Sequence, residues 1–91
     1  MPILRISRRR AGRELYDAAA AKLDIEHTHP LGLILHGAIE ADGVVQVAQV
    51  WESEEYQRCF EEEHLNPVLE EVGAPLDAEV ATFELQHLVT P

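Results

Sequence analysis

The sequence predicts an α+β domain whose elements follow the order β-α-β-β-α-β, and three observations lead to that order. A valine-rich segment, residues 44–51, runs directly into a helix that Ser53 is placed to cap. The dipeptide Asp42-Gly43 separates this segment from an earlier apolar run, as in a two-residue hairpin. A helical pattern precedes the hairpin, and an alternating segment follows the second helix. This order is the ferredoxin-like arrangement, a four-stranded antiparallel sheet with two helices on one face.

The first half of the chain supplies a strand, a helix and the first arm of the hairpin. Residues 2–7 alternate in polarity and are predicted as a short strand, with a turn over residues 8–12. Residues 13–23 place apolar side chains at helical spacing, which predicts the first helix. A polar loop over residues 24–30 then leads into a strand over residues 31–41.

The second half supplies the second helix and the last strand. Residues 54–64 are predicted as a helix because glutamates begin it and apolar residues follow at helical spacing. Asn66-Pro67 is expected to restart the helix, with asparagine as the cap and proline in the first helical position. Gly73 is expected to end this segment, and residues 79–89 to form the last strand.

The composition bounds the class of protein. With 91 residues, of which 46% are hydrophobic and 26% charged, we expect a single globular domain over residues 1–91. The one cysteine, Cys59, excludes an internal disulfide and a cysteine-based metal site. The first residues do not resemble a secretory signal, and the apolar runs are too short to span a bilayer. We therefore expect a cytoplasmic protein without a membrane partner.

The charge is unevenly distributed. The net charge is −10, yet most of the arginines lie within the first 13 positions. The acidic remainder would repel nucleic acid, so no nucleic-acid partner is expected. The arginine cluster could bind phosphate, but an isolated basic tip on an acidic body is a poor electrostatic footprint. The favoured interpretation is that these arginines pair with acidic helices of the same chain or of a partner subunit.

A family resemblance extends over nearly the whole chain. It is carried by Tyr16-Asp17, residues 32–36, Asp42-Gly43, residues 50–55, Phe60, Pro67, Gly73 and His87. These features resemble the dimeric α+β barrel superfamily, in particular its antibiotic-biosynthesis-monooxygenase-like members and small uncharacterised members of actinobacterial type. The resemblance implies a homodimer in which two sheets pack face to face. It also implies several alternative activities, including cofactor-independent quinone-forming monooxygenation and haem degradation, because this fold does not determine one function.

The chain departs from the monooxygenase pattern at two points. Those enzymes resemble one another in having an asparagine near the first strand, a tryptophan at the end of the third and, in the haem enzymes, a helical histidine. Trp51 matches the tryptophan, but the only asparagine is Asn66. His64 follows Trp51 too distantly to be equated with the haem ligand. No cofactor is therefore predicted.

The hairpin predicts which side chains share a face of the sheet. If Asp42-Gly43 is the turn, Ile34 lies opposite Trp51 and His36 opposite Gln49. All four side chains then lie on one face, which we expect to line the interior of the dimeric barrel. Two polar groups within an apolar surface are typical of a small-molecule pocket. The more uniformly apolar opposite set is expected to pack under the helices: Leu33, Leu35, Ile39, Val44, Ala48 and Val50.

His36 and Gln49 are the predicted catalytic residues. Histidine can act as acid, base or hydrogen-bond donor near neutral pH, and glutamine can fix its tautomer or orient a ligand. The alternative interpretation is a purely structural histidine that is paired with Gln49 or with buried water.

Four further residues are predicted to contact a ligand. Trp51 could stack on it and Ile34 could line the same surface. His87, expected on the last strand, could face the same cavity, and Tyr16 could present its hydroxyl group at the mouth. Each also has a structural interpretation, as a core or dimer-edge residue. His27 and His29 lack a third ligand nearby, so no metal site is predicted.

Together these observations predict a small dimer with a ligand-handling cavity. The leading hypothesis is a monooxygenase-like enzyme that needs no cofactor and acts on a hydrophobic or aromatic small molecule. The alternative is a non-catalytic ligand-binding or stress-related dimer of the same fold. A third interpretation is a structural dimer with a filled interior.

Overall fold

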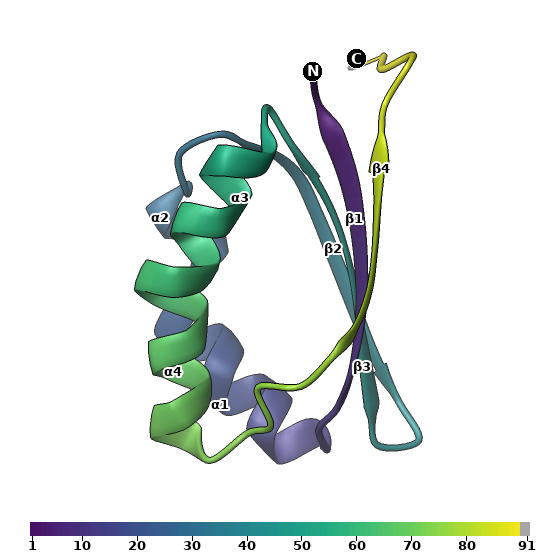
Figure 1. Cartoon of the computed structure of the whole chain (residues 1–91). Coiled ribbons are helices and arrows are strands. Elements are labelled where there is room, and N and C mark those ends of the chain that lie inside the picture. Colours follow the sequence, from purple (N-terminus) through teal and green to yellow (C-terminus); the bar gives the residue numbers. More distant parts are fainter. Residues whose placement is uncertain (90–91) are drawn as a thin grey trace.

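The computed structural model describes residues 1–89, which form a four-stranded antiparallel sheet with helices on one face (Figure 1). The strand order is β2-β3-β1-β4, with β1 pairing antiparallel with both β3 and β4. This is the predicted ferredoxin-like α+β fold. The elements are β1 (Ile3–Arg10), α1 (Arg13–Leu23), α2 (Ile25–Thr28), β2 (Leu33–Ala41), β3 (Val44–Trp51), α3 (Glu54–Phe60), the π-helical segment η1 (Glu61–Leu65), α4 (Asn66–Val72) and β4 (Glu79–Glu84).

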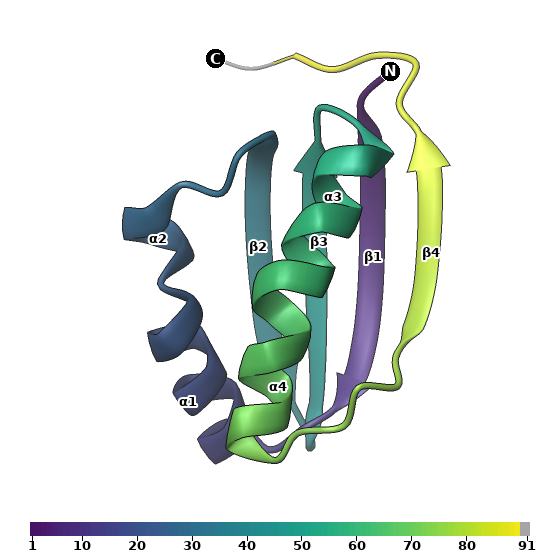
Figure 2. The ribbon, with the colours of Figure 1, turned by 60° about the vertical axis from the view of Figure 1, so that its left-hand side comes forward.

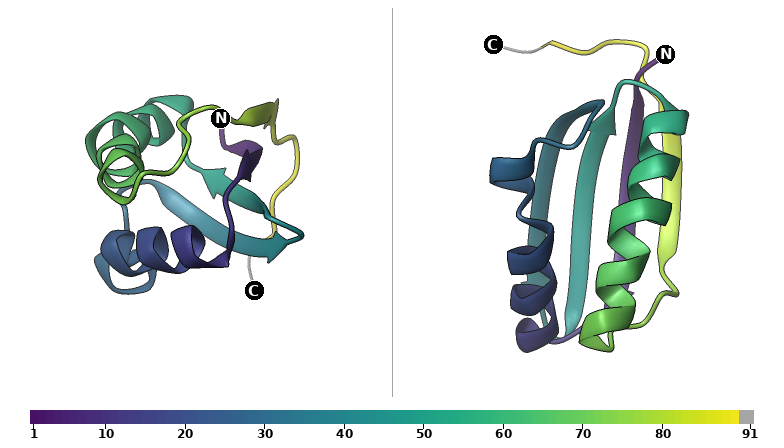
Figure 3. Two further views of the ribbon diagram at one scale, coloured as in Figure 1. Left: turned by 90° about the horizontal axis from the view of Figure 1, so that it is seen from below. Right: turned by 90° about the vertical axis from the view of Figure 1, so that its left-hand side faces the viewer.

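The helices form a single layer over the sheet. Figure 2 shows α1 running beside the rod made by α3, η1 and α4, and Figure 3 shows both on the same side of the strands. None of the helices in the described part of the chain is long and apolar enough to cross a membrane. Because both helical segments lie on the same side of the strands, the opposite face of the sheet carries no helix among residues 1–89.

The second helix is continuous, so the predicted restart at Asn66-Pro67 is wrong. Asn66 has helical backbone angles and no side chain caps α4. Proline lacks the N–H that an α-helical turn would use, and the wider turn of η1 lies immediately before Pro67. Gly73 ends the helix as predicted. Its φ of 77° is left-handed, and the N–H of Ala74 donates to the Leu69 carbonyl oxygen at 2.9 Å.

The hairpin forms as predicted near its turn but not at its far end. Asp42 and Gly43 both have positive φ, and His36 lies opposite Gln49. The register then shifts between Leu33 and Leu35, so that Leu33 pairs with Trp51. The prediction that Ile34 lies opposite Trp51 is wrong, because Ile34 is the extra residue of a β-bulge.

The C-terminal ends of the first and last strands differ from the prediction. Strand β1 continues to Arg10 where a turn was predicted, because residues 8–10 pair with residues 44–46 of β3. The backbone partners supplied by β3 therefore decide where β1 ends, because strand formation depends on context more than on local sequence. Strand β4 ends at Glu84, so His87 lies beyond the strand on which it was predicted. The predicted loop over residues 24–30 contains the short helix α2.

The core lies between the sheet and the helices. Ile3, Trp51 and Phe60 pack together, with the ring centroids of Trp51 and Phe60 5.3 Å apart. A second cluster joins α1 to α4 through Ala19 and Leu69. Trp51, at 0% exposed, is the one fully buried large side chain among residues 1–89. This end of the sheet is therefore closed by aromatic packing.

The predicted assignment of the two sheet faces is reversed. Gln49 and Trp51 lie under the helices with His36, whereas most of the uniformly apolar set faces away from them. Leu33 is the exception, because the bulge brings it opposite Trp51 and it packs in the core under the helices. Leu35 and Ile39, expected under the helices, are 53% and 58% exposed. The prediction fails because both faces carry apolar side chains, and apolarity alone does not tell which face the helices cover.

Two of the N-terminal arginines pair with acidic groups of the helices, as the favoured interpretation predicted. The guanidinium of Arg5 on β1 donates to Glu61 of η1 at 2.9 Å, which ties the sheet to the second helix. Arg13 contacts Asp17 one turn further along α1, at 3.3 Å. Arg9 makes no such ion pair among the described residues.

Candidate functional site

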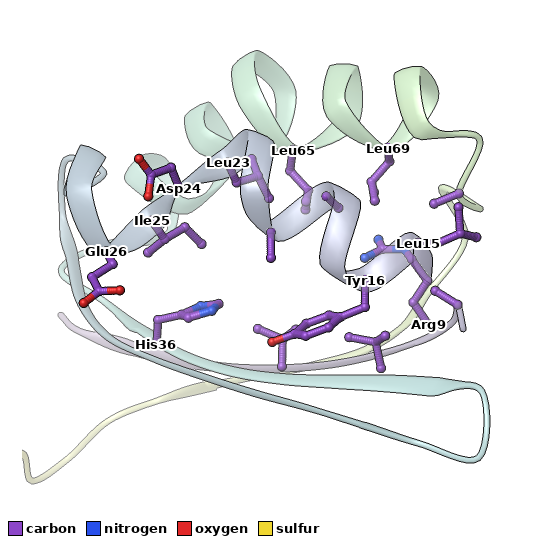
Figure 4. Close-up of a pocket in the computed structure, with 16 residues that line it drawn as sticks. Arg9, Leu15, Tyr16, Leu23, Asp24, Ile25, Glu26, His36, Leu65 and Leu69 are labelled. Atoms are coloured by element: carbon purple, nitrogen blue, oxygen red, sulfur yellow. The ribbon is translucent and has the colours of Figure 1, made fainter. Parts of the chain in front are cut away.

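A cavity of about 510 Å³ lies between the sheet and the helices (Figure 4). Val45 and Val47 of β3 form its floor, and α1 covers it together with Leu65 and Leu69 of the second helix. This volume falls within the range typical of small-molecule sites. The cavity is therefore lined by residues of one chain and lies on the opposite side of the sheet from the predicted barrel interior.

The two ends of the cavity carry opposite charge. His36 of β2 lies at one end, where Asp24 and Glu26 contribute carboxylates from the start of α2 (Figure 4). Arg9 of β1 lies at the other end, beside the buried Leu69. The side chains at the His36 end are exposed to solvent. The cavity is thus apolar along its length and polar at both ends.

His36 is held by a chain of two hydrogen bonds. The amide Nε2 of Gln49 lies 3.0 Å from His36 Nδ1, and the indole Nε1–H of Trp51 donates to Gln49 Oε1 at 3.0 Å. Gln49 is 9% exposed and Trp51 is fully buried. The chain runs from the strand end, where the core is closed, to the cavity.

This chain sets the tautomer of His36. The indole nitrogen of Trp51 can only donate, so the atom of Gln49 that faces it must be the amide oxygen. The amide nitrogen of Gln49 then faces His36 and donates to Nδ1. A neutral imidazole that accepts at Nδ1 carries its proton on Nε2. His36 is therefore arranged to present an N–H donor from its other nitrogen, rather than a basic nitrogen.

Partial burial of the imidazole, on the side that contacts Gln49, lowers the pKa of His36 below its ordinary value of 6.5. A histidine with a lowered pKa is predominantly neutral at pH 7, which is the state that the contact with Gln49 also favours. At neutral pH the site therefore offers an uncharged hydrogen-bond donor beside two carboxylates.

Replacing Trp51 with phenylalanine is expected to leave His36 as a mixture of its two neutral tautomers. Phenylalanine keeps most of the packing but has no N–H, so the amide of Gln49 can rotate and present either atom to Nδ1. Nitrogen-15 NMR of histidine-labelled protein should show protonated Nε2 and unprotonated Nδ1 in the wild type, and a mixture of tautomers in the variant. An unchanged pattern in Trp51→Phe would show that the indole does not set the tautomer.

Tyr16 is the second predicted residue that lines the cavity. Its ring extends from α1 across the floor, with the hydroxyl group directed toward the His36 end (Figure 4). The hydroxyl and the imidazole therefore approach the same part of the cavity from two different elements. This arrangement could grip a flat molecule between an aromatic ring and two polar groups.

Four of the predicted residues do not line the cavity. Gln49 is one of them, since it acts on the cavity only through its contact with His36. Trp51 is buried behind Gln49 and has no free ring face for stacking. Ile34 lies in the bulge, and His87 is exposed beyond the end of β4. Within this structure Trp51 acts on the site through Gln49.

The sequence analysis missed three residues at the two ends of the cavity: Arg9, Asp24 and Glu26. Arg9 was assigned to a turn, although the alternation of residues 3, 5 and 7 continues to it and would have placed it on the same face. Asp24 and Glu26 were assigned to a loop and gave no signal of their own. The carboxylate of Asp24 also accepts from His27 Nδ1 at 2.7 Å. Among residues 1–89, no three histidine, cysteine or acidic side chains are grouped to hold a metal.

Comparisons with known proteins place the fold but not the activity. No family model matches the chain, and no curated protein matches it. Among solved structures, a protein of unknown function from Nitrosomonas europaea, NE2512, is similar with a TM-score of 0.77 and 14% identity, covering 99% of this chain and 94% of that one.

Two further structures carry a function in their names. SnoaB, a cofactor-independent oxygenase from Streptomyces nogalater, has a TM-score of 0.68 and 12% identity, with 99% and 98% of the two chains covered. A "Putative antibiotic biosynthesis monooxygenase" from Nitrosomonas europaea has a TM-score of 0.72 and 7% identity, with 93% and 99% covered. At these identities the likeness shows a shared ferredoxin-like α+β fold, in agreement with the resemblance noted in the sequence.

Proposed function

We propose that the chain binds an anthrone-type aromatic ketone, or its hydroxylated tautomer, in the cavity and oxygenates it without a cofactor. The observation that carries this proposal is the Trp51–Gln49–His36 chain, which presents an N–H donor to an apolar cavity of about 510 Å³. Solved structures with this fold include a cofactor-independent oxygenase, which supports the reaction class. A shared fold would not be sufficient support without the site, because a protein of unknown function has the same fold.

The chemistry needs an acidic C–H group and an oxygen on which negative charge develops. Loss of a ring proton gives an enolate, and the His36 Nε2–H would donate to its oxygen, as an oxyanion-hole donor does. Glu26, at the same end of the cavity, is available as a proton acceptor. For an anthrone the balance is one anthrone plus one dioxygen to one anthraquinone plus one water. The methylene carbon loses two hydrogens and gains one oxygen, and the other oxygen atom leaves as water.

The test is turnover of anthrone by the wild type and by His36→Ala. We expect oxygen uptake and anthraquinone formation by the wild type, and a rate lower by about 10²–10³-fold in the variant, as for loss of one oxyanion donor. His29→Ala is the matched control, because His29 is exposed and does not line the cavity. Binding of anthrone without turnover by the wild type would favour the alternative, a ligand-binding protein. Absence of binding would refute both.

We also propose that two copies pair through the open face of the sheet. Ile6, Leu35, Ile39 and Phe83 are exposed there, on three different strands. An apolar face of this extent is a recognised mark of an association surface, and a second copy offers the same surface in return. A 91-residue chain has a small core, so burying this face would add stability. The cavity lies on the other side of the sheet and would remain accessible in such a dimer.

A further inference from the structure

Among residues 1–89, Arg9 is the one lysine or arginine whose side chain lines the cavity. It lies on β1 opposite Val45, and the buried residues Ala11, Leu69 and Ala74 surround that end of the cavity. In Figure 4 its guanidinium group extends from the sheet toward the helices, within the group of lining residues. The cavity therefore has a positive group at the end opposite His36.

The guanidinium of Arg9 is incompletely paired. Its Nε is buried and has no hydrogen-bond partner among the described residues. One terminal nitrogen donates to the Leu76 carbonyl oxygen, at 3.3 Å. Glu61, the nearby carboxylate that contributes to the charge environment of Arg9, already accepts from Arg5 at 2.9 Å and from Gln57 at 3.4 Å. A buried N–H without an acceptor is costly, so the unpaired Nε shows that the protein itself neutralises this guanidinium incompletely. A ligand in the cavity would meet the terminal N–H groups.

Burial also lowers the pKa of Arg9, while Glu61 raises it and Arg5 lowers it further. Arginine nonetheless stays protonated at neutral pH because its ordinary pKa is so high. The N–H groups in the cavity therefore belong to a positive charge that burial has partly stripped of water. Such a donor prefers an anionic acceptor, and a carboxylate matches its fork-shaped geometry.

The opposite end of the cavity has the opposite preference. Asp24 and Glu26 contribute carboxylates beside His36, so a carboxylate of the ligand would meet like charges there. The enolate of the proposed reaction forms only as Glu26 takes up a proton, so it adds no net charge at that end. A ligand with one anionic end would therefore be oriented, with its anion at Arg9 and its other end at His36. Gln49, which pairs with His36, and Val45, which pairs with Arg9, are four residues apart on β3, or about 13 Å along the strand. That length suits two or three fused rings.

From these contacts we infer that the cavity takes an elongated aromatic acid, with its carboxylate on Arg9 and its hydroxyl group at His36. The inference rests on the proposed function in that it assumes the same cavity is the binding site. It specifies that the ligand is an anion, states how the ligand is oriented in the cavity, and assigns Arg9 as a binding residue.

The test compares two probes that differ by one carboxylate, 2-naphthol and 6-hydroxy-2-naphthoic acid. Their affinities are measured by calorimetry at pH 7.4 and 0.15 M salt. We expect the acid to bind the wild type about tenfold or more tightly than 2-naphthol, as a charge-assisted hydrogen bond would add. In Arg9→Met the advantage of the acid should vanish while 2-naphthol binds as before. Arg9→Lys, which keeps the charge without the fork, should retain part of it.

Arg13→Met is the matched control, because it removes the same charge from an exposed helical position outside the cavity. It should keep the full advantage of the acid. Thermal unfolding gives a second readout: Arg9→Met should be no less stable than the wild type, since it removes an incompletely paired half-buried cation. A marked loss of stability would indicate instead that Arg9 has a structural role through Leu76.

The outcomes separate this inference from the proposed function. If 2-naphthol binds and the acid binds no more tightly, the anion site is refuted and the cavity function stands. The same holds if the acid keeps its higher affinity in Arg9→Met. If neither probe binds the wild type, both the cavity function and the anion site are refuted. If the acid gains and Arg9→Met alone abolishes the gain, Arg9 is the anion-binding residue.

Discussion

Replacing Trp51 with alanine is expected to lower the free energy of unfolding by about 3–5 kcal/mol, the usual loss for a large buried aromatic residue. Trp51 is 0% exposed and packs against Ile3 and Phe60 at the closed end of the core. Its loss also leaves Oε1 of the buried Gln49 without its donor, which adds a desolvation penalty. Small domains are stable by only about 5–15 kcal/mol, so this variant approaches the limit of folding.

The measurement is urea unfolding followed by circular dichroism, because the variant lacks the only tryptophan and with it the fluorescence signal. Trp51→Phe is the matched control. It keeps an aromatic ring against Phe60 but removes the indole N–H, and we expect a loss of about 1–2 kcal/mol, within the range for one buried group left unpaired. A loss below about 1 kcal/mol in Trp51→Ala would contradict the role of Trp51 as the centre of this core.

Replacing Leu35 with glutamate is expected to convert a dimer into a monomer. Leu35 is 53% exposed on the open face of the sheet, between the positions of other apolar side chains. In a symmetric dimer each substitution appears twice, so two carboxylates would be buried in an apolar interface. Burying an unpaired charge is among the largest penalties that one substitution can impose.

Light scattering after size exclusion measures the result directly. The wild type should have about twice the 10.2 kDa mass of the chain, and Leu35→Glu should have the monomer mass. Leu31→Glu is the matched control, since Leu31 is 76% exposed in the turn before β2, away from the sheet face. A monomeric wild type, or a Leu35→Glu variant that stays dimeric, would refute pairing through this face. Because the cavity lies under the helices, a folded Leu35→Glu monomer should still bind 2-naphthol.

Local signals in the sequence were sufficient for the element order and for half of the candidate site. The turn at Asp42-Gly43 needs positive φ at both positions, which few residue pairs accept, so it sets the register of His36 against Gln49. The Ser53 hydroxyl accepts from the N–H of Tyr56, as its position before the glutamates predicts. Such signals act between residues close in the chain, and a single sequence contains them in full.

The tertiary structure alone decided which face of the sheet meets the helices. Alternation defines two sets of side chains but not what covers each one, and both sets here are largely apolar. The choice follows from how Ile3, Trp51 and Phe60 fit together, and they come from three separate elements. Packing of that kind depends on shapes that composition does not encode.

The same limit explains the residues that were missed or misplaced. Arg9 lines the cavity because β1 pairs with β3 over residues 8–10, where a turn was predicted. Ile34 left the paired face because a bulge absorbed one residue, and His87 lies past the last backbone pairing of β4. Each outcome depends on backbone partners supplied by another strand. The sequence by itself therefore determined the order of the elements, their turns and the pairing of His36 with Gln49. Only the folded chain determined that this pair lies beneath the helices, with His36 at one end of a cavity and Arg9 at the other.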